Sequence, residues 1–418
     1  MCEMTRTIWP VGHGAFYTEV LDGPCEISVV YDCGGKGIKK QVKKFVSDHL
    51  PTPKNIDLLF ISHFHWDHIC GLRYLKQEGV TIKNIILPQT TNKSYALAEA
   101  YIYNACVGVN EEDNETISVA QEFIRQYANN EVGESHIVEV KKHEEGNDNS
   151  DPVIYDEDRV LNNKTLASGQ SIKVKGIVHD CFWEYIPVNI YEEELVQKLG
   201  DELKKLSQNN PKHTSFFKNN GEIDLGALDE WLSDKEAKSL IWDVYQQVFG
   251  KGTNPNAYSM PVYSGPVGVP LHHFVTEKVR GFIKFRPWLD SFDYDDHLLY
   301  NMPLLRNLRR RLCSCLYMGD FEPNNKYNNN TFVEILRTTL KDRWHYIGLQ
   351  QIPHHASPNN DCNDLYDHPK LCFANVDNHK DCSCTFDVLQ NIARNDCFPI
   401  VVTEENEPLS FDIWIHPN

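Results

Sequence analysis

The order of apolar and polar positions along the chain predicts strands first, and then strands and helices in alternation. Strand-type segments at 7–11 and 15–21 flank a Gly-His-Gly turn, and the apolar run at 56–61 is typical of a buried parallel strand. Residues 37–50 show helical spacing, with apolar side chains on one face and lysines opposite. Strand and helix patterns alternate again from residue 260 onward. This order favours two sheets with helices packed outside them.

A helical stretch interrupts the alternation. Residues 192–206 and 228–249 have strongly helical patterns, with no strand pattern between them. We therefore expect one α+β domain built from residues 1–190 and 253–418. Residues 191–252 are then a helical insertion, which could be a lid, a surface for a protein partner, or decoration without a role.

Composition limits the class of protein, its cellular compartment and its substrates. The 418 residues are 41% hydrophobic and 24% charged, a balance that excludes wholesale disorder. No apolar run is long enough to cross a membrane, and the N-terminus lacks the pattern of a secretory signal. The 13 cysteines are irregularly spaced, which favours free thiols in a reducing, cytoplasmic compartment. The net charge of −18 disfavours long-range attraction to nucleic acid, so a nucleic-acid substrate requires a basic groove or a metal site.

Four residues of the metal-ligand type lie within six positions after the apolar run at 56–61. They are His63, His65, Asp67 and His68, in the pattern H-x-H-x-D-H. Imidazole and carboxylate ligands together suit a first-row divalent ion, and we expect zinc or manganese. A sharp turn after the strand would direct His63 and His65 at one ion and the other two residues at a second. The alternative is a polar loop with incidental histidines, which the position directly after a buried strand disfavours.

This motif and three others resemble the metallo-β-lactamase superfamily, and most closely its branch typified by the hydrolase domain of ComEC-type DNA-uptake proteins. The other motifs are Tyr-Asp-Cys-Gly at 31–34, Leu-Tyr-Met-Gly-Asp at 316–320, and Gln-Ile-Pro-His-His-Ala-Ser at 351–357. Residues 256–264 also resemble the Asn-x-x-Ser strand of that branch. The resemblance covers about residues 1–190 and 253–418.

The resemblance implies a four-layer αββα sandwich with a site for two divalent metal ions at one edge of the sheets. It implies that Asp32 supports the metal loop from behind and that the carboxylate of Asp320 bridges the two ions. One histidine of the pair His354 and His355 would be the last ligand, and the other would support it or contact the substrate. The sequence leaves this choice open.

The chain departs from the family pattern at several positions. The third histidine of the first metal has no clear match, and His179 is either that ligand or an ordinary loop residue. Ala356 stands where the branch has glycine. Cys382 falls where the branch has a histidine near the site; it is then a group beside the metals, an inert thiol, or a sign that His379 is the true equivalent. His13 could reach the edge of the site or be a plain turn residue.

The chemistry implied is hydrolysis by a metal-activated water, with Asp67, His65 and Asp320 as the catalytic residues. We expect a phosphodiesterase or nuclease that acts on nucleic acid or nucleotides. Lysines within 39–44 and arginines within 306–311 are either phosphate contacts or solvated helix faces. A hydrolase of small-molecule thioesters or lactams is the first alternative. The second is an effector or binding module with a weakened metal site, controlled through the insertion, as in bacterial defence systems.

Overall fold

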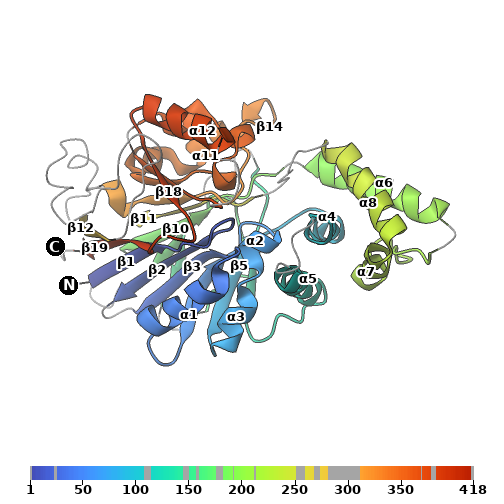
Figure 1. Cartoon of the computed structure of the whole chain (residues 1–418). Coiled ribbons are helices and arrows are strands. Elements are labelled where there is room, and N and C mark those ends of the chain that lie inside the picture. Colours follow the sequence, from blue (N-terminus) through green and yellow to red (C-terminus); the bar gives the residue numbers. More distant parts are fainter. Residues whose placement is uncertain are drawn as a thin grey trace.

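The computed structural model describes residues 2–22, 26–107, 114–144, 150–156, 160–175, 182–191, 193–210, 213–250, 259–267, 274–280, 311–368, 370–377 and 383–415. Two large sheets lie face to face, with helices on the outer side of each (Figure 1). This arrangement confirms the expected αββα sandwich. The sequence did not predict the strand at Phe274–Arg280.

The first sheet has nine strands among the described residues. Their order is β12 (Phe274–Arg280), β19 (Leu409–Ile415), β1 (Cys2–Ile8), β2 (Phe16–Asp22), β3 (Ile27–Cys33), β4 (Asn55–Phe60), β5 (Thr81–Pro88), β6 (His136–Val140) and β8 (Thr165–Leu166). Strands β1, β2 and β3 pair antiparallel, and the strands from β3 to β8 pair parallel. The carboxyl ends of β3 and β4 therefore meet at one edge of the sheet, where the 63–68 motif begins.

The second sheet has eight strands among the described residues. Their order is β18 (Phe398–Val402), β17 (Leu371–Asn375), β16 (Leu349–Gln351), β13 (Cys315–Tyr317), β11 (Val262–Pro266), β10 (Trp183–Pro187), β9 (Ile172–Val174) and β7 (Val153–Tyr155). Strands β13, β16, β17 and β18 run parallel, so the loops that follow them lie at a common edge. These loops carry Asp320 and the two histidines at 354 and 355.

Three hydrophobic clusters fill the spaces between the four layers. One lies between the sheets. The second packs α1 (Ile38–His49), α3 (Leu72–Gln77), α4 (Lys93–Cys106) and α5 (Asn114–Ala128) on the first sheet. The third packs α11 (Phe332–Leu340) and α12 (Ser383–Arg394) on the second sheet. Each sheet is therefore buried on both faces, which explains the near-continuous apolar runs of its parallel strands.

A buried ion pair joins the two sheets. Arg6 on β1 donates to Glu19 on β2 at 2.7 Å, and both side chains are fully buried. The carboxylate of Glu19 also accepts hydrogen bonds from Tyr185, Ser264 and Tyr317 of the second sheet, at 2.7–2.8 Å. Because these hydrogen bonds satisfy the buried carboxylate, the pair can fix the register of the two sheets at a tolerable cost in desolvation.

Three helices within the expected insertion form a helical lobe, namely α6 (Glu193–Asn209), α7 (Leu225–Ser233) and α8 (Lys235–Phe249) (Figure 1). The helical pattern over 228–249 is divided between two helices, because the side chain of Asp234 accepts from the amide of Ala237 and starts a new helix there. Apolar residues of the lobe belong to the same hydrophobic cluster as α4 and α5. The lobe therefore packs directly on the helices that cover the first sheet.

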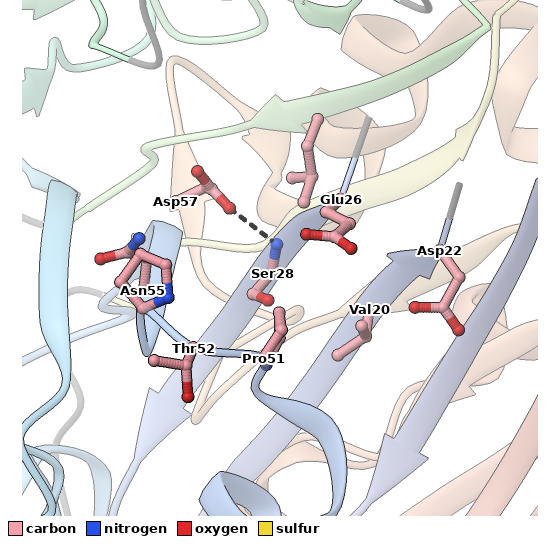
Figure 2. A pocket seen from close by; sticks show the side chains of 10 residues that line it. Val20, Asp22, Glu26, Ser28, Pro51, Thr52, Asn55 and Asp57 are labelled. Carbon is pink, nitrogen blue, oxygen red and sulfur yellow. Dashed lines mark hydrogen bonds between the residues drawn. The ribbon is translucent and has the colours of Figure 1, made fainter. Parts of the chain in front are cut away.

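A small cavity lies at the edge of the first sheet opposite the 63–68 motif. Its volume is about 90 Å³, and Asp22, Glu26 and Asp57 are among its lining residues (Figure 2). Asp57 accepts from the amide of Ser28 at 2.9 Å and pairs with Lys83 at 2.8 Å. These contacts satisfy the buried carboxylate of Asp57, which therefore holds the strand ends together. Among the described residues, no helix is long and apolar enough to cross a membrane.

Candidate metal centre

The loop that carries the H-x-H-x-D-H motif is held by the strand beside it. Asp32 lies near the end of β3 in a left-handed conformation, with φ of 54°. Its carboxylate accepts hydrogen bonds from the amide and the hydroxyl of Ser62, each at 2.7 Å. The same carboxylate contacts Nδ1 of His68 at 2.7 Å. Asp32 therefore contacts both the first and the last part of the motif, a position from which it can orient His68.

Two close contacts shape the loop further. A Cβ atom at Gly34 would overlap the backbone of Asp67 and His68, so only glycine allows the chain after β3 to approach the motif. The side chain of Asn104 on α4 accepts from the amide of Trp66 at 2.8 Å. The short helix α2 (Trp66–Ile69) consequently begins inside the motif, and the next helix, α3, begins at Leu72.

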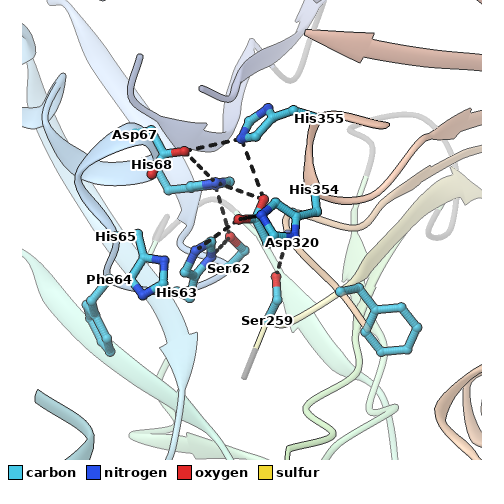
Figure 3. A network of polar contacts seen from close by, with 12 residues as sticks. Ser62, His63, Phe64, His65, Asp67, His68, Ser259, Asp320, His354 and His355 are labelled. Atoms are coloured by element: carbon cyan, nitrogen blue, oxygen red, sulfur yellow. Dashed lines mark hydrogen bonds and ion pairs between the residues drawn. The ribbon is translucent and has the colours of Figure 1, made fainter. Parts of the chain in front are cut away.

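The second sheet supplies the opposite side of the centre. Asp320 follows β13 after Gly319, which has a φ of +54°. The amide of Asp320 donates to the hydroxyl of Ser259 at 3.0 Å, and the amides of Met318 and Gly319 donate to the side chain of Gln351. These hydrogen bonds fix the turn and direct the carboxylate of Asp320 into the space between the sheet edges (Figure 3).

The histidine pair at 354 and 355 lies in a strained turn after β16. His354, His355 and Ala356 have φ values of 50°, 50° and 60°. Nε2 of His355 lies 3.1 Å from Asp67, and its Nδ1 contacts the carbonyl of Asn375. Nε2 of His354 lies 3.8 Å from Asp320, about as far as Nε2 of His355 at 3.7 Å. The contact with Asp67 is therefore what distinguishes His355 from His354 as a candidate ligand.

The ligand-type side chains form two clusters that share Asp320. The first consists of His63, His65 and Asp320, and the second of Asp67, His68, Asp320 and His355. The ligand atoms in each cluster lie within 4.8 Å of one another. Among the described residues, Nε2 of His63 and Nδ1 of His65 are buried without a hydrogen-bond partner. Buried polar atoms of this kind need partners, so the donor set fits two divalent ions bridged by one carboxylate.

The electrostatics of the metal-free centre act differently on its histidines and its carboxylates. Burial opposes the charge of His68, but Asp320, Asp67 and Asp32 outweigh burial and raise the pKa of His68 well above its ordinary value. Burial is also outweighed at Asp67, where the charge of His68 holds the pKa well below its usual range. Burial and the charge of His68 lower the pKa of His63. A divalent ion requires neutral imidazoles and ionised carboxylates, so His63 and Asp67 are already in the binding form, whereas His68 would release a proton when a metal binds.

The structure also places the remaining residues that the sequence singled out. Nε2 of His13 lies 3.3 Å from Asp67, and its ring centroid is 4.2 Å from that of His355. His13 therefore reaches the edge of the centre. His179, Cys382 and His379 lie outside the described residues.

Sequence reasoning missed the residues that hold the ligands in place. Ser62 and Asn375 are polar residues at strand ends, and nothing in their local pattern distinguishes them, whereas Ser259 is the serine of the Asn-x-x-Ser pattern in residues 256–264. Glu99 is different, because it is the single acidic residue of the otherwise largely apolar helix α4. Its carboxylate is buried and lies 3.7 Å from Nε2 of His65. A lone acid within an apolar helix was therefore a usable signal.

The family profile described as Metallo-beta-lactamase superfamily matches residues 20–89, which include Asp32 and the whole 63–68 motif. Comparison with the curated proteins gives no match. Among solved structures, the chain is similar to a long-form RNase Z from yeast, with 9% identity and a TM-score of 0.31. That similarity covers 89% of this chain but only 37% of the yeast chain. Residues 20–89 thus match the profile of the metallo-β-lactamase superfamily, and the chain has the αββα architecture that the resemblance implies.

Proposed function

We propose that this protein is a metal-dependent hydrolase that uses two divalent ions to cleave phosphodiester bonds in nucleic acid or nucleotides. The observation that carries the proposal is the carboxylate of Asp320, which is shared between the two ligand clusters. A shared carboxylate holds two ions at a short, fixed separation. Pairs of ions held in this way suit the displacement of one oxygen by another at phosphorus.

Two ions bound here would lower the pKa of a water molecule and polarise the scissile bond. The protein residues have separate tasks around them. Asp32 fixes the tautomer of His68 through Nδ1, so that Nε2 faces Asp320 at 3.1 Å. Asp67 lies within 3.3 Å of the imidazoles of His13 and His355, and it is placed to orient the attacking water. No serine or cysteine nucleophile is required.

The side chains at the rim of the centre support a phosphodiester substrate. The side chain of His13 is 21% exposed, whereas those of His63 and His68 are at most 1% exposed, so solvent and substrate reach the centre from the side of His13. Lys36 is exposed just beyond the Gly34 loop, and it pairs with Asp377 at 2.6 Å. Lys39 and Lys40 follow on the exposed face of α1. These cations can contact phosphate groups next to the scissile bond.

The resemblance of the late motifs to ComEC-type hydrolase domains supports the same substrate class. The test is a substrate screen on protein loaded with zinc or manganese. Bis(p-nitrophenyl) phosphate, linear DNA, RNA and cyclic nucleotides are compared with a chromogenic lactam and a thioester. We expect turnover in the phosphodiester group, lost in the Asp67→Ala variant. Turnover of the lactam or thioester alone would refute the proposed substrate class and favour an acyl hydrolase.

A further inference from the structure

The helix α4 presents two side chains to one metal-ligand residue. Glu99 and Tyr103 are four residues apart, so they lie on the same face of the helix. The ring of Tyr103 stacks on His65, with centroids 3.8 Å apart and an interplanar angle of 16°. Oε1 of Glu99 lies 3.7 Å from Nε2 of His65. The other ring nitrogen of His65, Nδ1, is the one buried without a hydrogen-bond partner among the described residues.

These contacts determine which edge of the imidazole is available to a metal ion. The stacked ring of Tyr103 holds the plane of the His65 ring, and the carboxylate of Glu99 faces its Nε2 edge. Nδ1 is therefore left as the atom that can join His63 and Asp320 in the first cluster. A carboxylate opposite the metal-binding nitrogen commonly fixes the tautomer and orientation of a histidine ligand and increases its basicity.

The helical lobe reaches the same carboxylate. Tyr245 on α8 is buried, and its hydroxyl donates to Oε1 of Glu99 at 2.6 Å. The ring centroid of Tyr245 lies 6.4 Å from that of Tyr103. Helices α4 and α8 pack against each other, as Figure 1 shows. A continuous series of contacts thus runs from the lobe through Tyr245 and Glu99 to His65.

We propose that Glu99 is a positioning residue for the first metal cluster, and that the lobe sets the metal affinity of this cluster through Tyr245. When α8 is docked, the hydroxyl of Tyr245 holds Oε1 of Glu99 opposite Nε2 of His65. When the docking of α8 changes, Glu99 loses this hydrogen bond and His65 loses its fixed orientation. A partner that displaces the lobe would then weaken the first cluster and leave the second intact. The inference rests on the metal centre proposed above.

The experiment compares the metal affinities of the full-length wild type with those of the Glu99→Gln and Tyr245→Phe variants. Cobalt titration, followed through the d–d absorption and by competition with a chelator, reports the two clusters separately from any turnover. In Glu99→Gln, we expect the affinity for one ion to fall by about 10–100-fold, as outer-shell substitutions commonly do, while the affinity for the second ion is unchanged. In Tyr245→Phe, we expect a smaller loss at the same ion, with an altered cobalt spectrum.

The chain offers a matched control for the docking of the lobe. Tyr101 on α4 is also buried, and its hydroxyl donates to Asp229 on α7 of the lobe at 2.7 Å. The Tyr101→Phe variant therefore removes a similar hydrogen bond between α4 and the lobe, but one that does not lead to His65. We expect this variant to bind both ions as the wild type does.

The outcomes separate the two proposals. If the wild type binds two ions and both test variants do the same with unchanged affinity, the positioning role of Glu99 is refuted and the metal centre stands. If Tyr101→Phe weakens the same ion as much as Tyr245→Phe does, the effect comes from lobe docking in general, and the specific role of Tyr245 is refuted. If the wild type binds no ion, both proposals fail. Should Glu99→Gln not fold, Tyr245→Phe decides the question.

Discussion

Replacement of Asp32 by asparagine tests how the fold prepares a histidine for metal binding. In the wild type, one carboxylate oxygen accepts from the amide of Ser62, and the other faces the hydroxyl of Ser62 and Nδ1 of His68. Asparagine keeps the shape of the side chain and can still accept from the amide. Its NH2 group would then face Nδ1 of His68 and require that nitrogen to accept. The proton of a neutral His68 would move to Nε2, the atom that lies 3.1 Å from Asp320.

The expected magnitudes follow from these contacts. Loss of a hydrogen bond to a charged group costs about 1.5–3 kcal/mol, so the free energy of unfolding of the metal-free protein should fall by about 2 kcal/mol. Metal affinity at the second cluster should fall by about 10–100-fold, because His68 is held in the wrong tautomer. Urea unfolding measures the first effect, and calorimetric titration with zinc measures the second.

A matched control separates the two effects. Asp57 is a buried aspartate of the same sheet that also accepts from a backbone amide, but it lies at the opposite edge (Figure 2). The Asp57→Asn variant should lose stability and keep both metal affinities. If Asp32→Asn bound both ions as tightly as the wild type, the supporting role of Asp32 would be refuted.

Three further substitutions test other parts of the structure. Glu19→Ala leaves Arg6 buried without its partner carboxylate, and urea unfolding should show a loss of about 3–5 kcal/mol in the free energy of unfolding; a loss below 1 kcal/mol would contradict a structural role for the pair. Gly34→Ala forces a Cβ against the backbone of Asp67. The free energy of unfolding should therefore fall by about 1–3 kcal/mol, and the metal content of the purified protein should fall as well. Normal values for both would show that the loop can move aside. Ala356→Gly removes the cost of a left-handed alanine at φ of 60°. The free energy of unfolding should therefore rise by up to about 1 kcal/mol, with the metal content unchanged. A clear decrease in the free energy of unfolding would mean that packing of the buried methyl group outweighs the backbone strain.

The fold was predictable because local pattern and layer packing agree. Both sheets are buried on each face, so their parallel strands are short apolar runs that stand out in the sequence. The break between α7 and α8 was missed because the apolar spacing continues across Asp234. Only the hydrogen bond from the amide of Ala237 shows that the side chain of Asp234 starts a second helix.

The centre was predictable only in part. The 63–68 motif concentrates its ligands within six positions, so sequence alone was enough to find it. Which of His354 and His355 faces Asp67 depends on consecutive left-handed residues, a conformation that the sequence does not predict. Glu99 acts on His65 only because α4 packs beside the motif loop, and that contact joins residues far apart in the chain. Roles of this kind arise from packing, and local pattern does not reveal them.

The metal content of the wild type and of the Asp320→Asn variant tests the central claim most directly. Each protein is loaded with zinc, dialysed and analysed for metal by mass spectrometry, with circular dichroism to verify the fold. We predict two ions per chain in the wild type. In the variant we predict a loss at both clusters, because Asp320 belongs to each of them. A wild type without bound metal, or a folded Asp320→Asn protein that retains two ions, would contradict a centre bridged by this carboxylate.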